Sequence, residues 1–329
     1  MKAAVYHRYG PPEVVRIEDI EKPVPKDNEV LVRVRATTVC AADWRLRSAN
    51  PFFIRLFMGL TAPRKVHVLG MEFSGTVESV GRAVTRFHAG DQVFGGRGFN
   101  FGGHAEYVCV PEDGTLAPMP ANMTFEEAAA ILFGAFTALT FLKKANIQAG
   151  QNVLVYGASG SVGVFTVQLA KHFGARVSAV CSTANLDMVK SLGADEVVDY
   201  TKEDFSRAGR VYDSIFDTVG YSGFSRSLRS LKRGGRYAQI GYSGHFLSIP
   251  GNMIRGMWAS LTGSAKVLGG VGTGTREDMD FLRTLIEAGK LRTVIDRCYP
   301  LERIAEAHRL AESGHKKGHA VVIVGGGDS

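Results

Sequence analysis

The chain has 329 residues, of which 45% are hydrophobic and 22% are charged, a balance that excludes a disordered or low-complexity protein. Its net charge of +7, from 39 basic and 32 acidic residues, is spread along the chain rather than gathered in one segment, which argues against a nucleic-acid-binding protein. The longest uncharged stretch that could pass for membrane-spanning, residues 128–142, falls short of the roughly 18 residues that a membrane span needs. Four scattered cysteines do not make a disulfide framework, so we expect a cytoplasmic protein.

The first 120 residues indicate an antiparallel, barrel-like domain. Short runs of alternating β-branched residues are separated by turn signals, such as Gly10-Pro11-Pro12 and Gly90-Asp91. The expected strands are residues 30–35, 75–80, 91–94 and 106–110. Because domains average about 150 residues, the chain has room for a second domain.

The character of the chain changes near residues 118–120. Thr124 and Glu127 form a capping-box pattern at the start of a long apolar helix that is expected to run to about Asn146. Strands and helices then alternate, with strands at 152–156, 176–180, 196–198, 212–216 and 236–240 and helices at 162–173, 186–192 and 224–231. Such alternation predicts right-handed crossovers and a doubly wound parallel sheet with helices on both faces.

The most informative motif is a glycine turn that follows the strand at 152–156 and opens the next helix. Its spacing, G-x-x-G-x-x-G, permits a tight turn and a close approach of the backbone to a pyrophosphate. The helix N-terminus adds amides and a positive dipole end for the anion. In this context the turn predicts dinucleotide binding, with a purely structural turn as the alternative. The residues concerned are Gly157, Ala158, Ser159, Gly160, Ser161, Val162 and Gly163.

The end of the second strand of this sheet indicates which dinucleotide is bound. An Asp or Glu about 20 residues after the turn usually holds the ribose 2′-hydroxyl of NADH, but the first acid here is Asp187. The strand ends instead in Ser182 and Thr183, and Lys190 follows. Hydroxyls and a nearby cation suit a 2′-phosphate, so we predict NADPH. The same hydroxyls suit the cap of a helix that begins near Asn185, and the two interpretations are compatible.

These motifs resemble the medium-chain dehydrogenase/reductase family, and within it the quinone oxidoreductase branch of zeta-crystallin-like enzymes. The segment from Gly150 to Gly163, followed by Gln168 and Lys171, is similar to the signature of that branch, with Ser161 where glycine is common. Further matches lie at residues 70–77, 103–107, 192–195 and 299–308, so the resemblance covers essentially the whole chain.

The resemblance implies an α/β fold made of a GroES-like antiparallel barrel-type domain and a Rossmann domain with a doubly wound parallel sheet. The GroES-like domain would comprise residues 1–122 and 266–329, and the NADP-binding Rossmann domain residues 123–265. The resemblance also implies a homodimer, and places Ser182, Asn185, Lys190 and Tyr200 near the adenosine phosphate. The residues nearer the nicotinamide would be Thr137, Ile240, Gly241, Val267 and Leu268.

Zinc alcohol dehydrogenases of the same superfamily are the main competing interpretation. Their catalytic zinc takes a Cys, then a His that precedes a Glu, then another Cys or an acid. Cys40 matches the first ligand, but Met71 replaces the histidine before Glu72. A thioether is a poor ligand for Zn²⁺, and residues 128–139 contain no Cys, His, Asp or Glu. We therefore expect no metal.

Without zinc, the expected reaction is hydride transfer from NADPH to a quinone or an α,β-unsaturated carbonyl. The charge that develops on such an acceptor is delocalised onto oxygen, so hydrogen-bond donors and a proton suffice. A simple alcohol needs its alkoxide stabilised, which a metal does well. The alternatives are an alcohol or aldehyde oxidoreductase of the same superfamily and a non-enzymatic, NADPH-binding crystallin-like or adaptor protein.

The catalytic residues are unknown from the sequence. The candidates for a cleft position are Cys40, Asp43 and His104. Asp43 also suits a helix N-cap, Cys40 a buried small residue and His104 a surface loop. The apolar segment 51–58 is either core or the wall of a site for a bulky apolar substrate.

Overall fold

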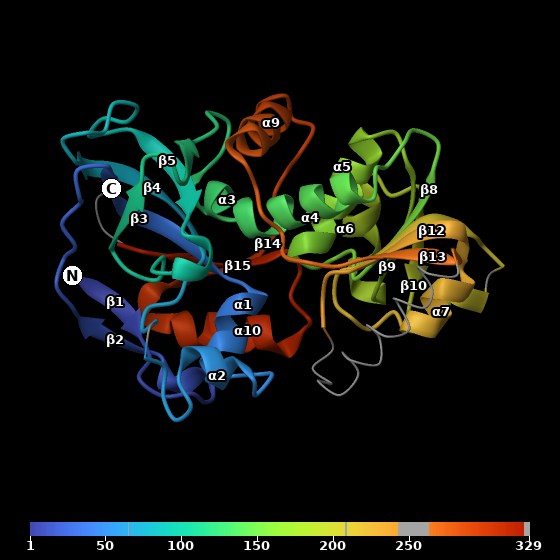
Figure 1. Cartoon of the computed structure of the whole chain (residues 1–329), viewed down its shortest axis with the longest axis horizontal. Coiled ribbons are helices and arrows are strands. Elements are labelled where there is room, and N and C mark those ends of the chain that lie inside the picture. The colour runs from blue at the N-terminus through green and yellow to red at the C-terminus, as the bar shows by residue number, and fades with distance from the viewer. Residues whose placement is uncertain (65, 208, 243–262, 326–329) are drawn as a thin grey trace. The chain divides into compact units, whose positions relative to one another are not determined.

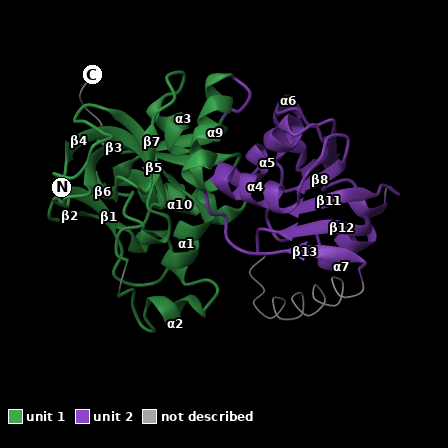
Figure 2. Ribbon diagram, turned by 45° about the horizontal axis from the view of Figure 1, so that its top comes forward, with its two compact units in different colours: residues 1–133, 275–288, 293–329 green, residues 134–274, 289–292 purple. Residues whose placement is uncertain are grey.

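The computed structural model describes residues 1–64, 66–207, 209–242 and 263–325 (Figure 1). The chain divides into two units, each with its own sheet (Figure 2). Unit 1 contains Met1–Phe133, Thr275–Ala288 and Thr293–Ser329, and unit 2 contains Gly134–Gly274 and Gly289–Arg292. None of the described helices combines the length and apolarity that crossing a membrane requires.

Unit 1 is built on a sheet whose described strands run in the order β14-β15-β3-β4-β5-β7, with β6 paired to β3. All these pairs are antiparallel except β14 with β15, which confirms the expected antiparallel domain. The strands are β3 (Glu29–Val39), β4 (Glu72–Val80), β5 (Gln92–Gly96), β6 (Tyr107–Pro111), β7 (Thr115–Pro118), β14 (Ile295–Pro300) and β15 (His319–Ile323). A separate hairpin pairs β1 (Lys2–Val5) with β2 (Arg16–Asp19). The helices of this unit are α1 (Ala41–Ser48), α2 (Ile54–Met58), α3 (Phe125–Ala129), α9 (Arg276–Glu287) and α10 (Ile304–Ser313).

Unit 2 is built on a wholly parallel sheet with the order β10-β9-β8-β11-β12-β13 among its described strands. Successive strands move outward from β8 in one direction and from β11 in the other, so the doubly wound sheet is confirmed and its switch point lies between β8 and β11. The strands are β8 (Asn152–Tyr156), β9 (Arg176–Cys181), β10 (Glu196–Asp199), β11 (Tyr212–Asp217), β12 (Leu231–Gln239) and β13 (Ala265–Leu268). The helices are α5 (Ser161–His172), α6 (Leu186–Ser191) and α7 (Phe224–Arg229). Helix α4 (Leu132–Lys144) begins in unit 1 and continues into unit 2.

The unit boundaries differ from the expected ones. The first falls after Phe133 rather than after residue 122, because the small residues at the end of α3 pack on Ala36 and Val321 of the unit 1 sheet. The second falls at Thr275 rather than at residue 266, because β13 pairs with β12 and extends the parallel sheet. The long apolar helix expected from Thr124 is two helices, α3 and α4, separated at residues 130–131.

Candidate functional site

The glycine turn joins β8 to α5, and two of its glycines are required by the chain itself. Gly157 has φ +80°, and a Cβ there would lie 2.7 Å from Val219 Cγ1 and 2.8 Å from Thr218 Oγ1. A Cβ at Gly163 would lie 2.2 Å from the Gly157 oxygen. Gly157 therefore permits the turn, and Gly163 permits helix and strand to pack closely.

Gly160, the residue before α5, is different, because neither its backbone nor any neighbour in the described part of the chain requires glycine. Its φ of −83° and ψ of 174° suit any residue, and among the described residues a Cβ there would meet only the Gly157 oxygen, at 3.5 Å. Gly160 is the N-cap residue of α5 and, because it has no side chain, makes no side-chain capping hydrogen bond to the helix. Open space beside an uncapped helix N-terminus fits a bound phosphate group. Ala158, Ser161 and Val162, also predicted here, are buried, and Ser159 is half-buried.

The residues after β9 form the predicted ribose group, and the structure brings most of them together. Asn185 is buried, and its Nδ2 donates to Ser182 Oγ at 3.2 Å, while its Oδ1 is buried without a partner among the described residues. Tyr200 lies beside them, since its amide donates to the Cys181 carbonyl at 3.1 Å. Thr183 donates its hydroxyl to Asp199.

Lys190 is the exception, and its predicted role as the cation of this subsite does not fit its position. Its ammonium donates to the Asp195 carbonyl at 2.6 Å, and the Asp195 amide donates to the Val177 carbonyl near the start of β9. Helix α6 runs back along the sheet, so a residue in its last turn lies at the amino ends of the strands. The carboxyl ends, where the turn and Ser182 lie, are at the opposite edge.

Asp199, which was not predicted from the sequence, reaches this group from the neighbouring strand. It is the last residue of β10 and pairs in register with Cys181, the last residue of β9. Its side chain is buried, and hydrogen bonds, the largest effect being that of Thr183, hold the pKa of its carboxyl at about 2. The sequence feature that could have indicated it is Asp199-Tyr200-Thr201 at the end of the third strand. Neighbouring parallel strands end at the same side of the sheet, so the residues at their carboxyl ends lie close together.

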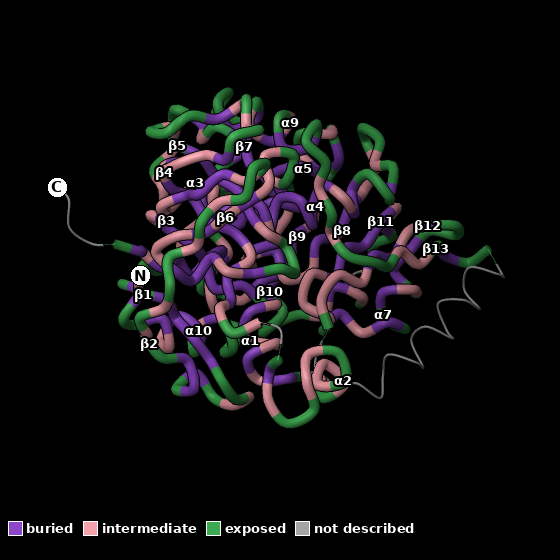
Figure 3. Tube along the Cα trace, turned by 60° about the vertical axis from the view of Figure 1, so that its left-hand side comes forward, coloured by how far each residue is buried: buried purple, intermediate pink, exposed green. Residues whose placement is uncertain are grey.

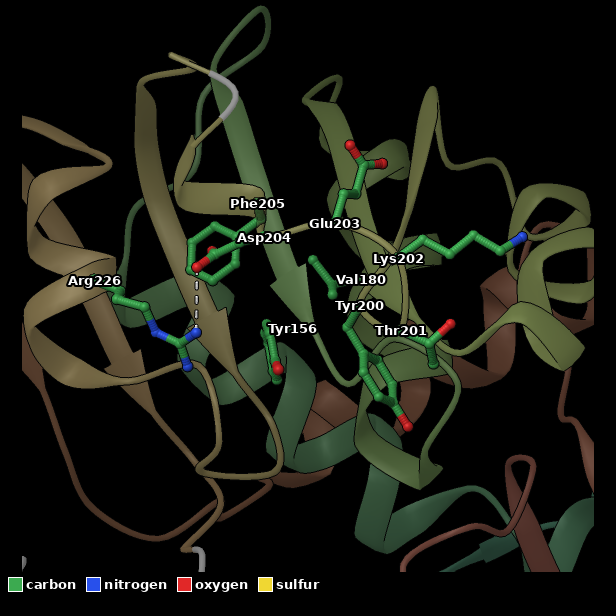
Figure 4. A pocket seen from close by; sticks show the side chains of 9 residues that line it. All are labelled: Tyr156, Val180, Tyr200, Thr201, Lys202, Glu203, Asp204, Phe205 and Arg226. Atoms are coloured by element: carbon green, nitrogen blue, oxygen red, sulfur yellow. Dashed lines mark hydrogen bonds and ion pairs between the residues drawn. The ribbon is translucent and has the colours of Figure 1, made fainter.

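A cavity of about 220 Å³ opens at the same edge of the unit 2 sheet (Figure 4). Tyr156 and Phe205 lie in its wall with ring centroids 5.7 Å apart in an edge-on arrangement. Arg226 pairs with Asp204 across one side, at 3.4 Å. Aromatic walls of this kind suit a planar base such as adenine. The lining residues are Tyr156, Val180, Tyr200, Thr201, Lys202, Glu203, Asp204, Phe205 and Arg226.

The residues predicted near the nicotinamide lie directly after β12, on β13 and on α4. Ile240 and Gly241 follow β12, and both amides donate to the Asp217 carbonyl at the end of β11. A Cβ at Gly241 would lie 2.5 Å from the Thr218 oxygen, so glycine permits this close approach. Val267 and Leu268 pair with β12, and Thr137 of α4 is buried.

Asp217 organises the loop between these segments. Its carboxylate accepts hydrogen bonds from the Gly220 amide at 2.7 Å, from the amide and hydroxyl of Ser222 at 3.0 and 2.6 Å, and from the Tyr237 hydroxyl at 3.3 Å. Thr218, the next residue, donates to the Tyr156 and Gly157 carbonyls. The loop is thereby fixed against the glycine turn. Neither Asp217 nor Thr218 was predicted from the sequence.

The three catalytic candidates of unit 1 are all buried and hold structural positions. Asp43 accepts from the Cys40 amide at 2.7 Å and from the Gly70 amide at 2.9 Å, so it stabilises the start of α1. His104 Nε2 lies 2.9 Å from the Thr38 oxygen, and its ring packs edge-on against His308. The surface-loop interpretation of His104 is therefore wrong. Burial raises the pKa of the Cys40 thiol well above its usual value.

Glu72 is a buried acid of the same unit, and it titrates in an accessible range. It accepts hydrogen bonds from Thr38 Oγ1 at 2.5 Å and from the Phe133 amide at 2.7 Å. Burial raises its pKa from 4.5 to about 7, although both hydrogen bonds oppose the shift. The folded protein therefore holds this proton more tightly than the unfolded chain does.

We expect the free energy of unfolding to fall as the pH rises from 4.5 to about 7, by a component that Glu72→Gln lacks. The stabilisation from this proton is fully present below the unfolded pKa and is lost as the pH passes the folded pKa. Urea unfolding of both proteins at about pH 5 and about pH 8 measures the difference. Equal pH dependence in the two proteins would contradict the assignment.

The apolar segment at 51–58 contains α2 and has no fully buried residue (Figure 3). Phe52, Leu56 and Phe57 are 68%, 67% and 71% exposed, so the core interpretation is wrong. The interpretation as a wall for an apolar substrate stays a prediction.

Two residues of the resembled signature, Gln168 and Lys171, have structural roles. The buried Gln168 amide accepts from the Arg292 amide at 3.0 Å and donates to the Arg292 and Val164 carbonyls at 3.0 and 2.9 Å. Lys171 donates to both carboxylate oxygens of Asp195, at 2.9 and 2.8 Å. Gln168 thus ties the segment around Arg292 to α5.

Gln168→Ala is expected to lower the free energy of unfolding by about 2 kcal/mol, because it leaves buried backbone groups without partners. NADPH affinity should stay within about twofold, because the side chain is tied to the Arg292 backbone rather than to the turn. Urea unfolding and NADPH titration measure the two effects. Gln151→Ala, which removes a hydrogen bond to the Gln148 amide only, is the control. A selective loss of NADPH affinity would contradict this role.

The metal ligands of zinc alcohol dehydrogenases are not reproduced in unit 1. Met71 stands in the histidine position, and the adjacent Glu72 carboxylate is occupied by its two hydrogen bonds. Within residues 1–64, 66–207, 209–242 and 263–325, no group of three or more His, Cys, Asp or Glu side chains is arranged to hold a metal ion.

Comparisons with known proteins agree with this architecture. A zinc-binding dehydrogenase family model matches residues 192–322, and an alcohol dehydrogenase GroES-like domain model matches residues 26–121. The chain is 32% identical to NADPH-dependent alkenal/one oxidoreductase, chloroplastic, of Arabidopsis thaliana, over 98% of this chain and 79% of that protein. It is 32% identical to quinone oxidoreductase of Sus scrofa, over 94% and 93%. The structure of the quinone oxidoreductase from Coxiella burnetii superposes with a TM-score of 0.88 at 30% identity, covering 99% of both chains. The chain therefore belongs to the medium-chain dehydrogenase/reductase family, in the branch of quinone oxidoreductases and enone reductases.

Proposed function

We propose that the protein is an NADPH-dependent reductase that transfers hydride to a quinone or an α,β-unsaturated carbonyl without zinc. The observation that supports this is Gly160, because its ordinary backbone conformation and the space beside it among the described residues suit a phosphate at the start of α5. The names of the Arabidopsis and pig relatives support the cofactor and the two substrate classes.

The residues of unit 2 bind and orient the cofactor. The first amides of α5, from Ser161 onward, would hold the pyrophosphate. Ser182 and Asn185 would contact the ribose phosphate, and the aromatic cavity would take the adenine. Ile240 and Gly241 would border the nicotinamide, which supplies the hydride when NADPH is bound.

The proton that completes the reduction is assigned to water. Cys40, Asp43 and His104 are buried and engaged in unit 1, so none of them is assigned as the donor. A delocalised hydroquinone or enolate anion is basic enough to take a proton from water without a dedicated acid. Zinc is left out because a thioether at Met71 does not suit it.

The test is NADPH oxidation, followed by absorbance, with a panel of quinones, enones and aldehydes, and with zinc content measured on the same sample. Consumption with a quinone or enone and substoichiometric zinc supports the function. Activity confined to aldehydes, with stoichiometric zinc, would favour the alcohol or aldehyde oxidoreductase. NADPH binding without oxidation by any acceptor would favour the non-enzymatic alternative.

We further propose that the chain forms a homodimer and acts in the cytoplasm. The family resemblance supports the dimer. Sedimentation at the monomer mass would refute the dimer, and fractionation of cells to an organelle would refute the location.

A further inference from the structure

We propose that Asp199 sets the balance between NADPH and NADH, a role that rests on the proposed function. Asp199 ends β10 beside Cys181 at the end of β9. The carboxyl ends of these two parallel strands therefore deliver Thr183 and Asp199 to the same place, which is the subsite predicted for the ribose.

Both oxygens of the Asp199 carboxylate are engaged by the residues that follow the two strands. Oδ2 accepts from Thr183 Oγ1 at 2.5 Å and lies 3.5 Å from Lys202 Nζ. Oδ1 accepts from the amide and hydroxyl of Thr201, at 3.0 and 2.7 Å. Asp199 is only 6% exposed. With its pKa held at about 2, the group is ionised at every pH at which the protein would work.

Because the Thr183 hydroxyl donates to Asp199, it is not available to donate a hydrogen bond to a 2′-phosphate. A threonine hydroxyl has one proton, so Thr183 does not donate to Asp199 and to a phosphate at once. Its oxygen still accepts a hydrogen bond from a ribose 2′-hydroxyl. NADH sites usually carry an acid at the end of the second strand, where it binds the ribose 2′-hydroxyl. Here the acid is at the end of the third strand, and it would act on the ribose through the Thr183 hydroxyl.

The carboxylate also acts on a 2′-phosphate through its charge. A 2′-phosphate bound in this subsite would be repelled by the negative charge of the buried carboxylate. Lys202, which is largely exposed, offsets part of that repulsion. The site therefore binds NADPH through Ser182 and Asn185, while Asp199 lowers the ratio of NADPH affinity to NADH affinity.

The test is equilibrium binding of NADPH and of NADH to the full chain, measured by nicotinamide fluorescence. Asp199→Asn is expected to raise the ratio of NADPH to NADH affinity about tenfold, which corresponds to about 1.4 kcal/mol. The control is Glu196→Gln, because Glu196 is the first residue of the same strand and therefore lies at the amino ends of the strands, away from the ribose subsite. It removes one negative charge about a Debye length or more away, so the ratio should stay within about twofold.

Thr183→Val is an independent variant. If the Thr183 hydroxyl donates its proton to Asp199, this substitution should change NADPH affinity less than about twofold. If the hydroxyl instead donates to the 2′-phosphate, the substitution should lower NADPH affinity about tenfold or more. A selective loss of NADPH affinity in Thr183→Val overturns the inference. So does an unchanged ratio in Asp199→Asn, or an equal loss of both affinities, which would make Asp199 only a support for the loop. If the wild-type protein binds neither nucleotide, the proposed function itself fails.

Discussion

Replacing Gly160 with leucine is expected to abolish NADPH binding and to leave the protein folded. The backbone conformation at this residue suits any side chain, and the atom nearest to a Cβ at this position would be the Gly157 oxygen, at 3.5 Å. The described residues therefore leave room for the substitution. A phosphate bound by the first amides of α5 would occupy the same space as the leucine.

Calorimetric titration with NADPH should show a loss of affinity of at least about 100-fold, or about 2.7 kcal/mol, with little change in the unfolding temperature. Gly157→Leu provides the contrast, because φ is +80° there and a Cβ would lie 2.7 Å from Val219. That variant should be strongly destabilised. Wild-type NADPH affinity in Gly160→Leu would show that the pyrophosphate does not lie at this turn.

Asp217→Ala is expected to lower the free energy of unfolding by about 3 kcal/mol. Asp217 is 1% exposed, and its carboxylate accepts from Gly220, Ser222 and Tyr237. Alanine leaves those donors buried without an acceptor, which costs more than the loss of a single surface hydrogen bond. NADPH affinity should fall as well, because the loop after β11 buttresses the Gly157 turn through Thr218.

Urea unfolding of the purified chain measures the stability change. Asp187→Ala is the matched control, because Asp187 is an acid in the first turn of α6 that is not buried, and its loss should cost about 0.5 kcal/mol. If the two variants lose similar stability, Asp217 does not organise the loop as described.

Much of the fold could be predicted from the sequence, because alternating strands and helices with short connections specify a parallel sheet. The boundaries could not, since they depend on packing between distant segments. The end of α3 belongs to unit 1 because it packs on Ala36 and Val321. Residues 230–231 were expected to end a helix, but β12 starts at Leu231, which pairs with Tyr212 of β11.

The candidate site shows the same division. The glycine turn is local in sequence and was predicted residue by residue. Asp199 was missed because its contact with Thr183 depends on the pairing of β9 with β10. The prediction for Lys190 was wrong because its sequence distance from the turn does not show that it lies at the far end of α6, beside the amino ends of the strands. His104 is buried by His308, which is about 200 residues away in the chain.

The most direct test of the central claim is the fate of the hydride. NADPH carrying deuterium at both positions of the nicotinamide C4 is incubated with the protein and an enone, and the product is analysed by mass spectrometry and NMR. We expect a saturated carbonyl compound with one deuterium on the former β-carbon. Deuterium on the carbonyl carbon of an alcohol, or a product without deuterium, would contradict reduction of a conjugated acceptor by direct hydride transfer.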